Sequence, residues 1–130
     1  KRINDNKQMS DVWRLPAIAP WEKSCGKHPC QKPLAVLARI IMASTRPGAW
    51  MLDPFTGSST TGIAANLLER RFLGIDKEEA YLDISRKRKY EIEDPKIITK
   101  YQKKIKDIAF LKQMNDTANE NISIGYDLPF

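Results

Sequence analysis

A carboxylate between an apolar run and a turn of small residues constrains the fold of this chain more than any other feature. Residues 49–52 are apolar and predict a buried strand, and Asp53 follows them directly. The turn after Asp53 is rich in Gly, Ser and Thr, and the pattern up to residue 71 predicts a helix. In open α/β sheets, ligands bind at the carboxyl ends of strands, where helix N-termini offer unpaired N–H groups. The stretch therefore predicts a ligand-binding strand–turn–helix unit.

The turn matches neither of two common nucleotide-binding motifs. Gly57 and Gly62 have the spacing of a Walker A loop, but Ile63 and Ala64 stand where Lys and Ser or Thr are required. The G-x-G-x-x-G pattern of nicotinamide-binding proteins is missing as well. Asp53 would repel a phosphate, so it suits a cationic or amino-bearing ligand.

A second apolar run, residues 72–75, also ends in a carboxylate, Asp76. A carboxylate at the tip of the next strand is well placed to accept both hydroxyls of a ribose. The two segments together predict a ligand with a ribose and a positive or amino-bearing end, and S-adenosylmethionine fits this description. The alternative is an ordinary strand–turn–helix with two solvated aspartates.

Two motifs resemble those of the amino-group DNA methyltransferases. Residues 53–61, D-P-F-T-G-S-S-T-T, resemble the cofactor motif D-P-F-x-G-S-G-T-T, and residues 27–33, K-H-P-C-Q-K-P, resemble the K-H-P-T-Q-K-P segment. Ser59 stands where the family has glycine, and Cys30 stands where it has threonine. Both replacements are small, so cofactor binding is expected to survive them. The resemblance extends over residues 11–92.

The resemblance implies an α/β, Rossmann-like fold of S-adenosylmethionine-dependent methyltransferases, of which this chain holds a partial sheet. S-adenosyl-L-methionine would be the cofactor, with Asp53 near its methionine amino group and Asp76 at its ribose hydroxyls. Phe55 would pack against the cofactor, and Gly57 would allow its close approach. The cofactor-binding residues that the resemblance implies are His28, Gln31, Lys32, Asp53, Pro54, Phe55, Gly57, Ser58, Thr60, Thr61 and Asp76.

The family's catalytic motif, an Asp, Asn or Ser followed by Pro-Pro and an aromatic residue, is absent from this sequence. No catalytic residue is therefore assigned to the chain. The motif order resembles the permuted arrangement, in which the catalytic motif and the target-recognition region come first. The chain is expected to be the carboxyl-terminal, cofactor-binding part of a restriction-modification enzyme that methylates N6 of adenine in duplex DNA. Three alternatives stay open: methylation of cytosine N4, an RNA or small-molecule substrate, and a DNA-binding or assembly fragment that binds no cofactor.

Three regions are predicted along the chain. Residues 1–33 would be the end of the target-recognition region and a loop that covers the cofactor. Residues 34–94 would form the cofactor-binding α/β core, and residues 95–130 a basic amphipathic helix and a tail. Two parallel strands joined by a helix leave a sheet edge that needs another segment beside it. The chain is therefore expected to be poorly stable alone.

Hydrophobic periodicity predicts the elements within these regions. Helices are expected at residues 34–45, 60–71, 77–92 and 97–114, and further short strands at 12–15 and 122–126. The charged side chains expected to point outward are Glu69, Arg70, Arg71 and the basic run at residues 86–89. Ile40 and Ala80 are expected to contribute to the apolar faces of their helices.

Charge and composition bear on partners and location. The net charge of +6 fits a polyanion such as double-stranded DNA. The chain starts without Met in a polar run, which predicts a missing amino-terminal catalytic half on the same or a separate chain; a homodimer is an open alternative. No signal peptide or apolar run of membrane-spanning length is present, so a bacterial cytoplasmic location without a membrane partner is expected.

Two thiols and one imidazole lie close together in the sequence. Cys25 and Cys30 flank His28, which gives three potential zinc ligands but no fourth nearby. Reduced, structural thiols and no metal are therefore expected.

Overall fold

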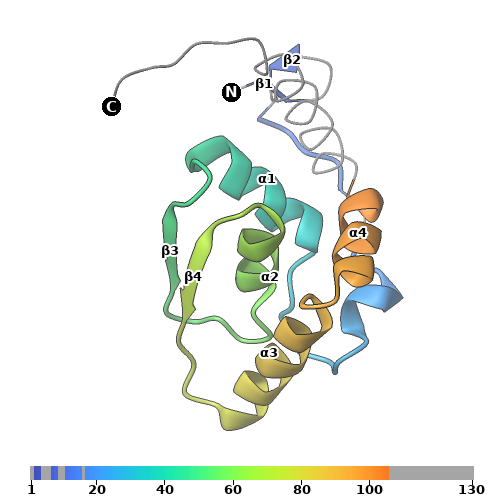
Figure 1. Cartoon of the computed structure of the whole chain (residues 1–130), viewed down its shortest axis with the longest axis vertical. Helices are drawn as coiled ribbons and strands as arrows, with labels where there is room; N and C mark the ends of the chain where they lie inside the picture. The colour runs from blue at the N-terminus through green and yellow to red at the C-terminus, as the bar shows by residue number, and fades with distance from the viewer. Residues whose placement is uncertain (1, 4–6, 9–10, 16, 106–130) are drawn as a thin grey trace.

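The computed structural model describes residues 2–3, 7–8, 11–15 and 17–105. Within these ranges the elements follow one another in the order shown in Figure 1. They are β1 (Arg2–Ile3), β2 (Lys7–Gln8), the short 3₁₀ helix η1 (Pro20–Lys23), α1 (Leu34–Ser44), β3 (Trp50–Asp53), α2 (Thr60–Leu67), β4 (Arg71–Gly74), α3 (Glu79–Glu91) and α4 (Pro95–Lys104). The α/β class is therefore confirmed, as a small parallel sheet with helices.

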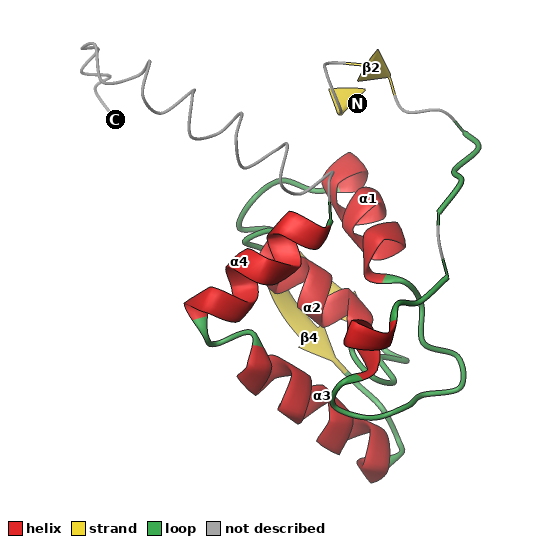
Figure 2. Ribbon diagram, turned by 90° about the vertical axis from the view of Figure 1, so that its right-hand side faces the viewer, coloured by secondary structure: helices red, strands yellow, loops and turns green. Residues whose placement is uncertain are grey.

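The predicted strand–turn–helix–strand unit forms the centre of the fold. Strands β3 and β4 pair in parallel, with Leu52 opposite Leu73 and Asp53 opposite Gly74. Helix α2 makes the crossover between them and lies in front of β4 in Figure 2. The ladder continues past β4, because the N–H of Ile75 donates to the carbonyl of Asp53 at 2.9 Å. This extension carries the chain to Asp76 directly beside the turn that follows Asp53.

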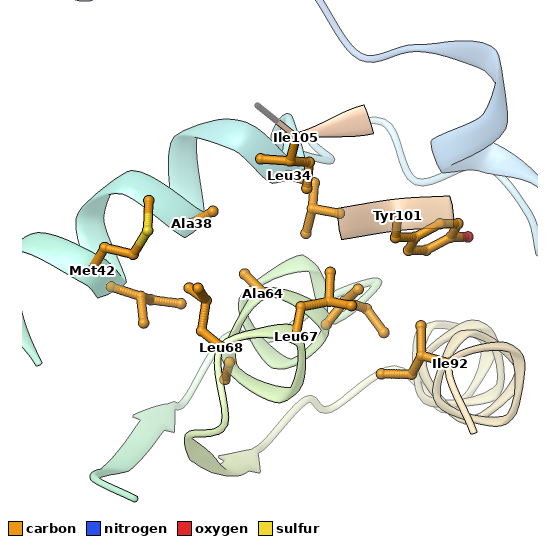
Figure 3. Packing of buried hydrophobic residues seen from close by; sticks show 12 residues of the cluster. Leu34, Ala38, Met42, Ala64, Leu67, Leu68, Ile92, Tyr101 and Ile105 are labelled. Atoms are coloured by element: carbon orange, nitrogen blue, oxygen red, sulfur yellow. The ribbon is translucent and has the colours of Figure 1, made fainter. Parts of the chain in front are cut away.

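The hydrophobic core lies between α1, α2 and the residues of α4 (Figure 3). Helix α1 contributes four buried side chains and α2 contributes four more, and these pack against the end of α3 and one side of α4. The buried apolar residues are Leu34, Ala38, Ile41, Met42, Ile63, Ala64, Ala65, Leu67, Leu68, Ile92, Tyr101 and Ile105. Ile40, which was expected to widen the apolar face of α1, is instead 45% exposed, because the face turns toward Ala38 and Met42.

Several predicted bounds and orientations are wrong. The strand expected at residues 12–15 is absent from this described stretch. Helix α2 ends at Leu67 and not at residue 71, because Glu69 takes the left-handed conformation with φ 61° and β4 begins at Arg71. Ala80 on α3 is exposed. The helix predicted at residues 97–114 begins two residues earlier, at Pro95, and ends at Lys104, because Ile105 takes an extended conformation. Residues 106–114 and the strand expected at 122–126 lie outside the described residues.

Two arginines that were expected to face solvent are buried. Arg70 is 8% exposed, and its guanidinium donates to the carbonyls of Leu68 and Thr45 and to the Thr45 hydroxyl. Arg88, in the basic run of α3, is 4% exposed. In both cases backbone carbonyls of loops replace water around the cation, which is why a charge pattern alone did not reveal the burial.

One face of the β3–β4 pair carries exposed apolar side chains. The exposed fractions are 68% for Trp50, 64% for Leu52, 55% for Leu73 and 51% for Ile75. Because side chains alternate along a strand, these four share one face, opposite the face that α2 covers. The strand predicted as buried is therefore buried on one face only. We call these four residues the open sheet face.

No helix among the described residues is long and apolar enough to cross a membrane.

The contact between Gly62 and Phe72 fixes how closely α2 approaches β4. A Cβ added at Gly62 would lie 2.5 Å from Cε1 of Phe72, well inside contact distance. Alanine normally favours a helix interior over glycine by about 1 kcal/mol. Here we expect Gly62→Ala to lower the free energy of unfolding by about 1–3 kcal/mol because of overpacking, as measured by urea unfolding.

The control is Lys87→Ala on an exposed position of α3, which should change the free energy of unfolding by less than about 0.5 kcal/mol. Adding Phe72→Leu to Gly62→Ala should restore part of the loss. Stabilisation by Gly62→Ala alone would contradict this packing.

Candidate functional site

The turn between β3 and α2 is shaped by its own backbone and by the end of β4. The N–H of Thr56 donates to the carbonyl of Ile75 at 2.9 Å, and the N–H of Ser59 donates to the carbonyl of Thr56 at 2.8 Å. Gly57 has φ +51°, a left-handed conformation that favours glycine. We call residues 53–60 the cofactor-motif turn.

Ser59, the residue that departs from the resembled motif, also adopts the left-handed conformation, with φ 57° and ψ 37°. This conformation costs a residue with a side chain on the order of 1 kcal/mol. The Ser59 hydroxyl shares a buried hydrogen bond of 2.8 Å with the Thr56 hydroxyl, which offsets part of that cost. Ser59 thus fits the backbone shape that glycine provides in the resembled motif.

A cavity of about 260 Å³ lies between this turn and the loop at residues 27–33. Nine of the eleven residues predicted to bind a cofactor line it: His28, Gln31, Lys32, Asp53, Phe55, Gly57, Ser58, Thr60 and Thr61. Pro54 and Asp76 do not. The cavity is also lined by Cys30, Leu37 and Thr56, which were not among the predicted residues. Cys30 and Thr56 lie inside the two motifs, so the motifs could have indicated them as lining residues. Leu37 could have been found only by its place in the first turn of α1.

The carboxylate of Asp53 is held in place from two sides. Its Oδ1 accepts a hydrogen bond from the N–H of Phe55 at 3.1 Å, and its Oδ2 accepts one from the hydroxyl of Thr61 at 2.7 Å. Helix α2 begins at Thr60 as expected, and Thr61 in addition anchors this carboxylate. The anionic group therefore stands fixed at the wall of the cavity.

Asp76 does not line the cavity, but its carboxylate binds two backbone N–H groups, including one of the turn. Its Oδ2 accepts a hydrogen bond from the N–H of Gly57 at 2.8 Å, and its Oδ1 accepts one from the N–H of Glu78 at 2.9 Å. These backbone donors hold the pKa of Asp76 below its usual value, with the Glu78 N–H as the largest cause. Because folding lowers the pKa of Asp76, its carboxylate stabilises the folded chain at pH values above the pKa in the unfolded chain. This stabilisation is lost as the pH falls through the lower pKa of the folded chain.

The loop at residues 27–33 lies directly against the turn, although the two motifs are separated in sequence. A Cβ added at Gly57 would lie 2.9 Å from Nε2 of His28, so only glycine leaves room for the imidazole. The ring of His28 packs edge-on against Tyr81 with centroids 4.2 Å apart. The N–H of Cys30 donates to Nδ1 of His28 at 3.1 Å, which places the ring proton on Nε2 in the neutral form.

Gln31 lines this cavity and has a buried acceptor atom without a partner. The side chain is 7% exposed, and its Nε2 donates to the carbonyl of Glu22 at 2.8 Å. That bond fixes which end of the amide is the nitrogen. Within the described part of the chain, Oε1 is a buried atom with no hydrogen-bond partner. Buried polar atoms are rarely left unpaired, so Oε1 lacks the donor that a buried acceptor normally has.

Sequence reasoning missed Glu22, which supports Gln31 from η1. Glu22 is 7% exposed, and its two carboxylate oxygens accept hydrogen bonds from the N–H groups of Ala19 at 3.2 Å and Leu34 at 2.7 Å. It thereby ties the loop to the start of α1. No local pattern marks this role, because both partners are backbone groups.

The two cysteines are free thiols. Burial, and then the nearby carboxylate of Glu91, raise the pKa of Cys25 above its usual value. Among residues 11–15 and 17–105, no group of three or more His, Cys, Asp or Glu side chains is arranged to hold a metal ion.

Comparison with known proteins places this geometry in a family. The profile of the N6/N4 DNA methylases, described as "DNA methylase", matches residues 1–87. The chain is 49% identical over 106 residues to the type II methyltransferase M2.MboI of Moraxella bovis. The aligned region covers 82% of this chain and 38% of that protein. It is 57% identical over 88 residues to the type II methyltransferase M2.DpnII of Streptococcus pneumoniae, covering 68% of this chain and 33% of that protein.

A solved structure supports the same assignment. The crystal structure of an M1.HpyAVI–SAM complex superposes with a TM-score of 0.56 and 40% sequence identity, over 68% of this chain and 44% of that one. The chain thus spans less than half the length of these relatives. Since the family profile matches more than half of the chain, this protein belongs to the N6/N4 DNA methylase family.

Proposed function

We propose that this chain is the S-adenosyl-L-methionine-binding part of a restriction-modification DNA methyltransferase that methylates N6 of adenine in duplex DNA. The observation that carries the proposal is that both motifs line one cavity, and that one of the lining residues, Gln31, has a buried acceptor without a partner. Relatives named as type II methyltransferases support the enzyme class, and the SAM bound to M1.HpyAVI supports the cofactor. Adenine is favoured over cytosine by the order of the motifs.

The groups that line the cavity fit the amino-acid end of the cofactor. An ammonium group is a donor, and Gln31 Oε1 is a buried acceptor without a partner. The fixed carboxylate of Asp53 supplies the opposite charge. Gly57 has no Cβ, so the His28 imidazole can lie against the turn beside these groups. Asp76 would receive the ribose hydroxyls with the lone pairs that Gly57 and Glu78 leave free.

The chemistry assigned to this chain is orientation of the donor. When bound, the cofactor supplies an electrophilic methyl group. The residues of this chain would hold it by its ends, so that the methyl group faces the acceptor nitrogen in line. The acceptor side, including the extrahelical pocket for a base flipped out of the duplex, belongs to the motif that this sequence lacks. A catalytic half is therefore part of the proposal.

The replacement of glycine by Ser59 was the basis for the alternative of a fragment that binds no cofactor. Ser59 does not line the cavity, and its hydroxyl shares a hydrogen bond with the hydroxyl of Thr56. The added side chain therefore leaves the space for a ligand unchanged. This observation favours the cofactor-binding function over the alternative.

The open sheet face is the surface that the catalytic half would cover. Four apolar side chains, Trp50, Leu52, Leu73 and Ile75, are each more than half exposed there. In the described residues, β3 pairs with β4 on one side, which leaves its other edge open for a further strand. A domain of this class buries both faces of its parallel sheet. The remaining strands and helices would thus come from the part of the relatives that this chain does not match.

Leu52→Asp is expected to weaken association with that catalytic half by at least tenfold, since burying a leucine is worth about 1.5–3 kcal/mol. The binding partner in the assay is the portion of M2.MboI that this chain does not match, and the affinity is measured by calorimetry. The matched control is Ile40→Asp on α1, which is also exposed but lies away from the open sheet face. Equal losses for both variants would argue against this surface.

Methyl transfer tests the proposed function directly. The chain is incubated with radiolabelled S-adenosylmethionine and mixed-sequence duplex DNA, with and without the catalytic portion of M2.MboI. We expect cofactor binding but no labelled DNA for the chain alone, and label on N6 of adenine when the catalytic portion is added. Label on cytosine N4 would select the cytosine alternative. Absence of both label and cofactor binding would support a DNA-binding or assembly fragment.

Gln31→Met is expected to lower the affinity for S-adenosylhomocysteine by about tenfold, since a hydrogen bond to a charged group is worth about 1.5–3 kcal/mol. Gln102→Met is the control, because Gln102 also donates to a backbone carbonyl, that of Leu67, and lies away from the cavity. Affinity is measured by calorimetry and stability by urea unfolding. If Gln31→Met binds as tightly as the wild type, Gln31 has no role in binding the cofactor.

A further inference from the structure

Helix α3 lies beside the loop that leads into α2 and donates two side-chain hydrogen bonds to consecutive carbonyls of the cofactor-motif turn (Figure 1). The hydroxyl of Ser85 donates to the carbonyl of Gly57 at 2.8 Å. Nη1 of Arg88 donates to the carbonyl of Ser58 at 2.6 Å. Because residues three apart in a helix share a face, Ser85 and Arg88 approach the turn together.

Arg88 also contacts two hydroxyls of the same turn. Its Nη1 lies 3.0 Å from the hydroxyl oxygen of Thr60, the first residue of α2, and 3.3 Å from that of Ser58. Ser58 and Thr60 line the cavity, whereas Arg88 does not. The guanidinium therefore influences the cavity indirectly, through its contacts with residues that line it.

The position of Arg88 is electrostatically unfavourable by itself. The side chain is 4% exposed, and none of the ion pairs found between described residues involves it. Burial lowers the pKa of Arg88, and the more distant groups Tyr101, Glu22 and Glu91 partly oppose that shift. A cation at the N-terminus of α2 also opposes the helix dipole. A buried charge in such a place needs its hydrogen bonds to the turn to be satisfied.

We propose that Arg88 is a positioning residue for the cofactor, which fixes residues 58–60 in the conformation that receives it. The proposal rests on the cofactor-binding function proposed above. Ser85 acts on the neighbouring carbonyl, and Asp76 holds the Gly57 N–H from the opposite side. The turn is thereby held at three backbone groups of Gly57 and Ser58 before a ligand arrives, which lowers the conformational entropy lost on binding.

Arg70 provides a matched control for Arg88. It is also buried, at 8% exposure, its pKa is also lowered by burial, and it also donates to loop carbonyls, those of Leu68 and Thr45. Arg70 differs in that it makes no contact with the cofactor-motif turn. A loss of cofactor affinity that follows from removing any buried arginine should therefore be equal for substitutions of Arg70 and of Arg88.

The test compares Arg88→Met, Arg88→Lys and Arg70→Met in the full chain. The dissociation constant of S-adenosylhomocysteine is measured by calorimetry, and the free energy of unfolding by urea titration at the same temperature. Arg88→Met is expected to weaken binding by about tenfold, Arg88→Lys to recover part of that loss through its remaining charge and donor, and Arg70→Met to lose stability with binding changed less than about threefold.

Three results would overturn the role of Arg88. They are unchanged binding in Arg88→Met, an equal loss of binding in Arg70→Met, and no recovery in Arg88→Lys. If Arg88→Met does not fold, Arg88→Lys against Arg70→Lys provides the same comparison: weaker binding in Arg88→Lys alone supports the role, and equal binding opposes it. Absence of binding by the wild-type chain would instead overturn the proposed function, so the two failures are distinguishable.

Discussion

Parallel pairing of β3 with β4 is the constraint on which the rest of the structure depends. The ladder runs beyond the strands, from the Ile75 N–H to the carbonyl of Asp53 and from the Thr56 N–H to the carbonyl of Ile75. These two bonds bring the end of β4 under the turn that leaves β3. Asp76 can then reach the N–H of Gly57, and the shape of the cavity wall follows.

Side chains that bond to backbone groups hold the loops of this molecule together. Glu22 ties η1 to the start of α1, Arg70 ties the end of α2 to Thr45, and Arg88 ties α3 to the turn. Each of these groups is charged and buried, so each would be costly without its partners. Two of these side chains, Glu22 and Arg88, therefore fix segments that border the cavity through polar contacts with the backbone.

Local patterns predicted much of this arrangement. The apolar runs ending in Asp53 and Asp76 predicted two parallel strands, and the two motifs predicted most residues that line the cavity. The burial of Arg70 and Arg88 could not be predicted, because their partners are carbonyls 25 and 30 residues away in the chain. The exposure of Trp50 and Leu52 also escaped prediction, since an apolar strand does not reveal how many of its faces are covered. The roles of the cavity residues in binding a cofactor stay predictions.

The open sheet face has a kinetic consequence. An unpaired parallel edge beside exposed apolar side chains accepts any extended segment that meets it, including one from a second copy of the same chain. Self-association of this kind is second order in the chain, whereas docking of the catalytic half proposed above would depend on the concentrations of both. The yield of a properly completed sheet is then governed by a competition between rates, and dilution of the chain relative to its partner favours the completed sheet.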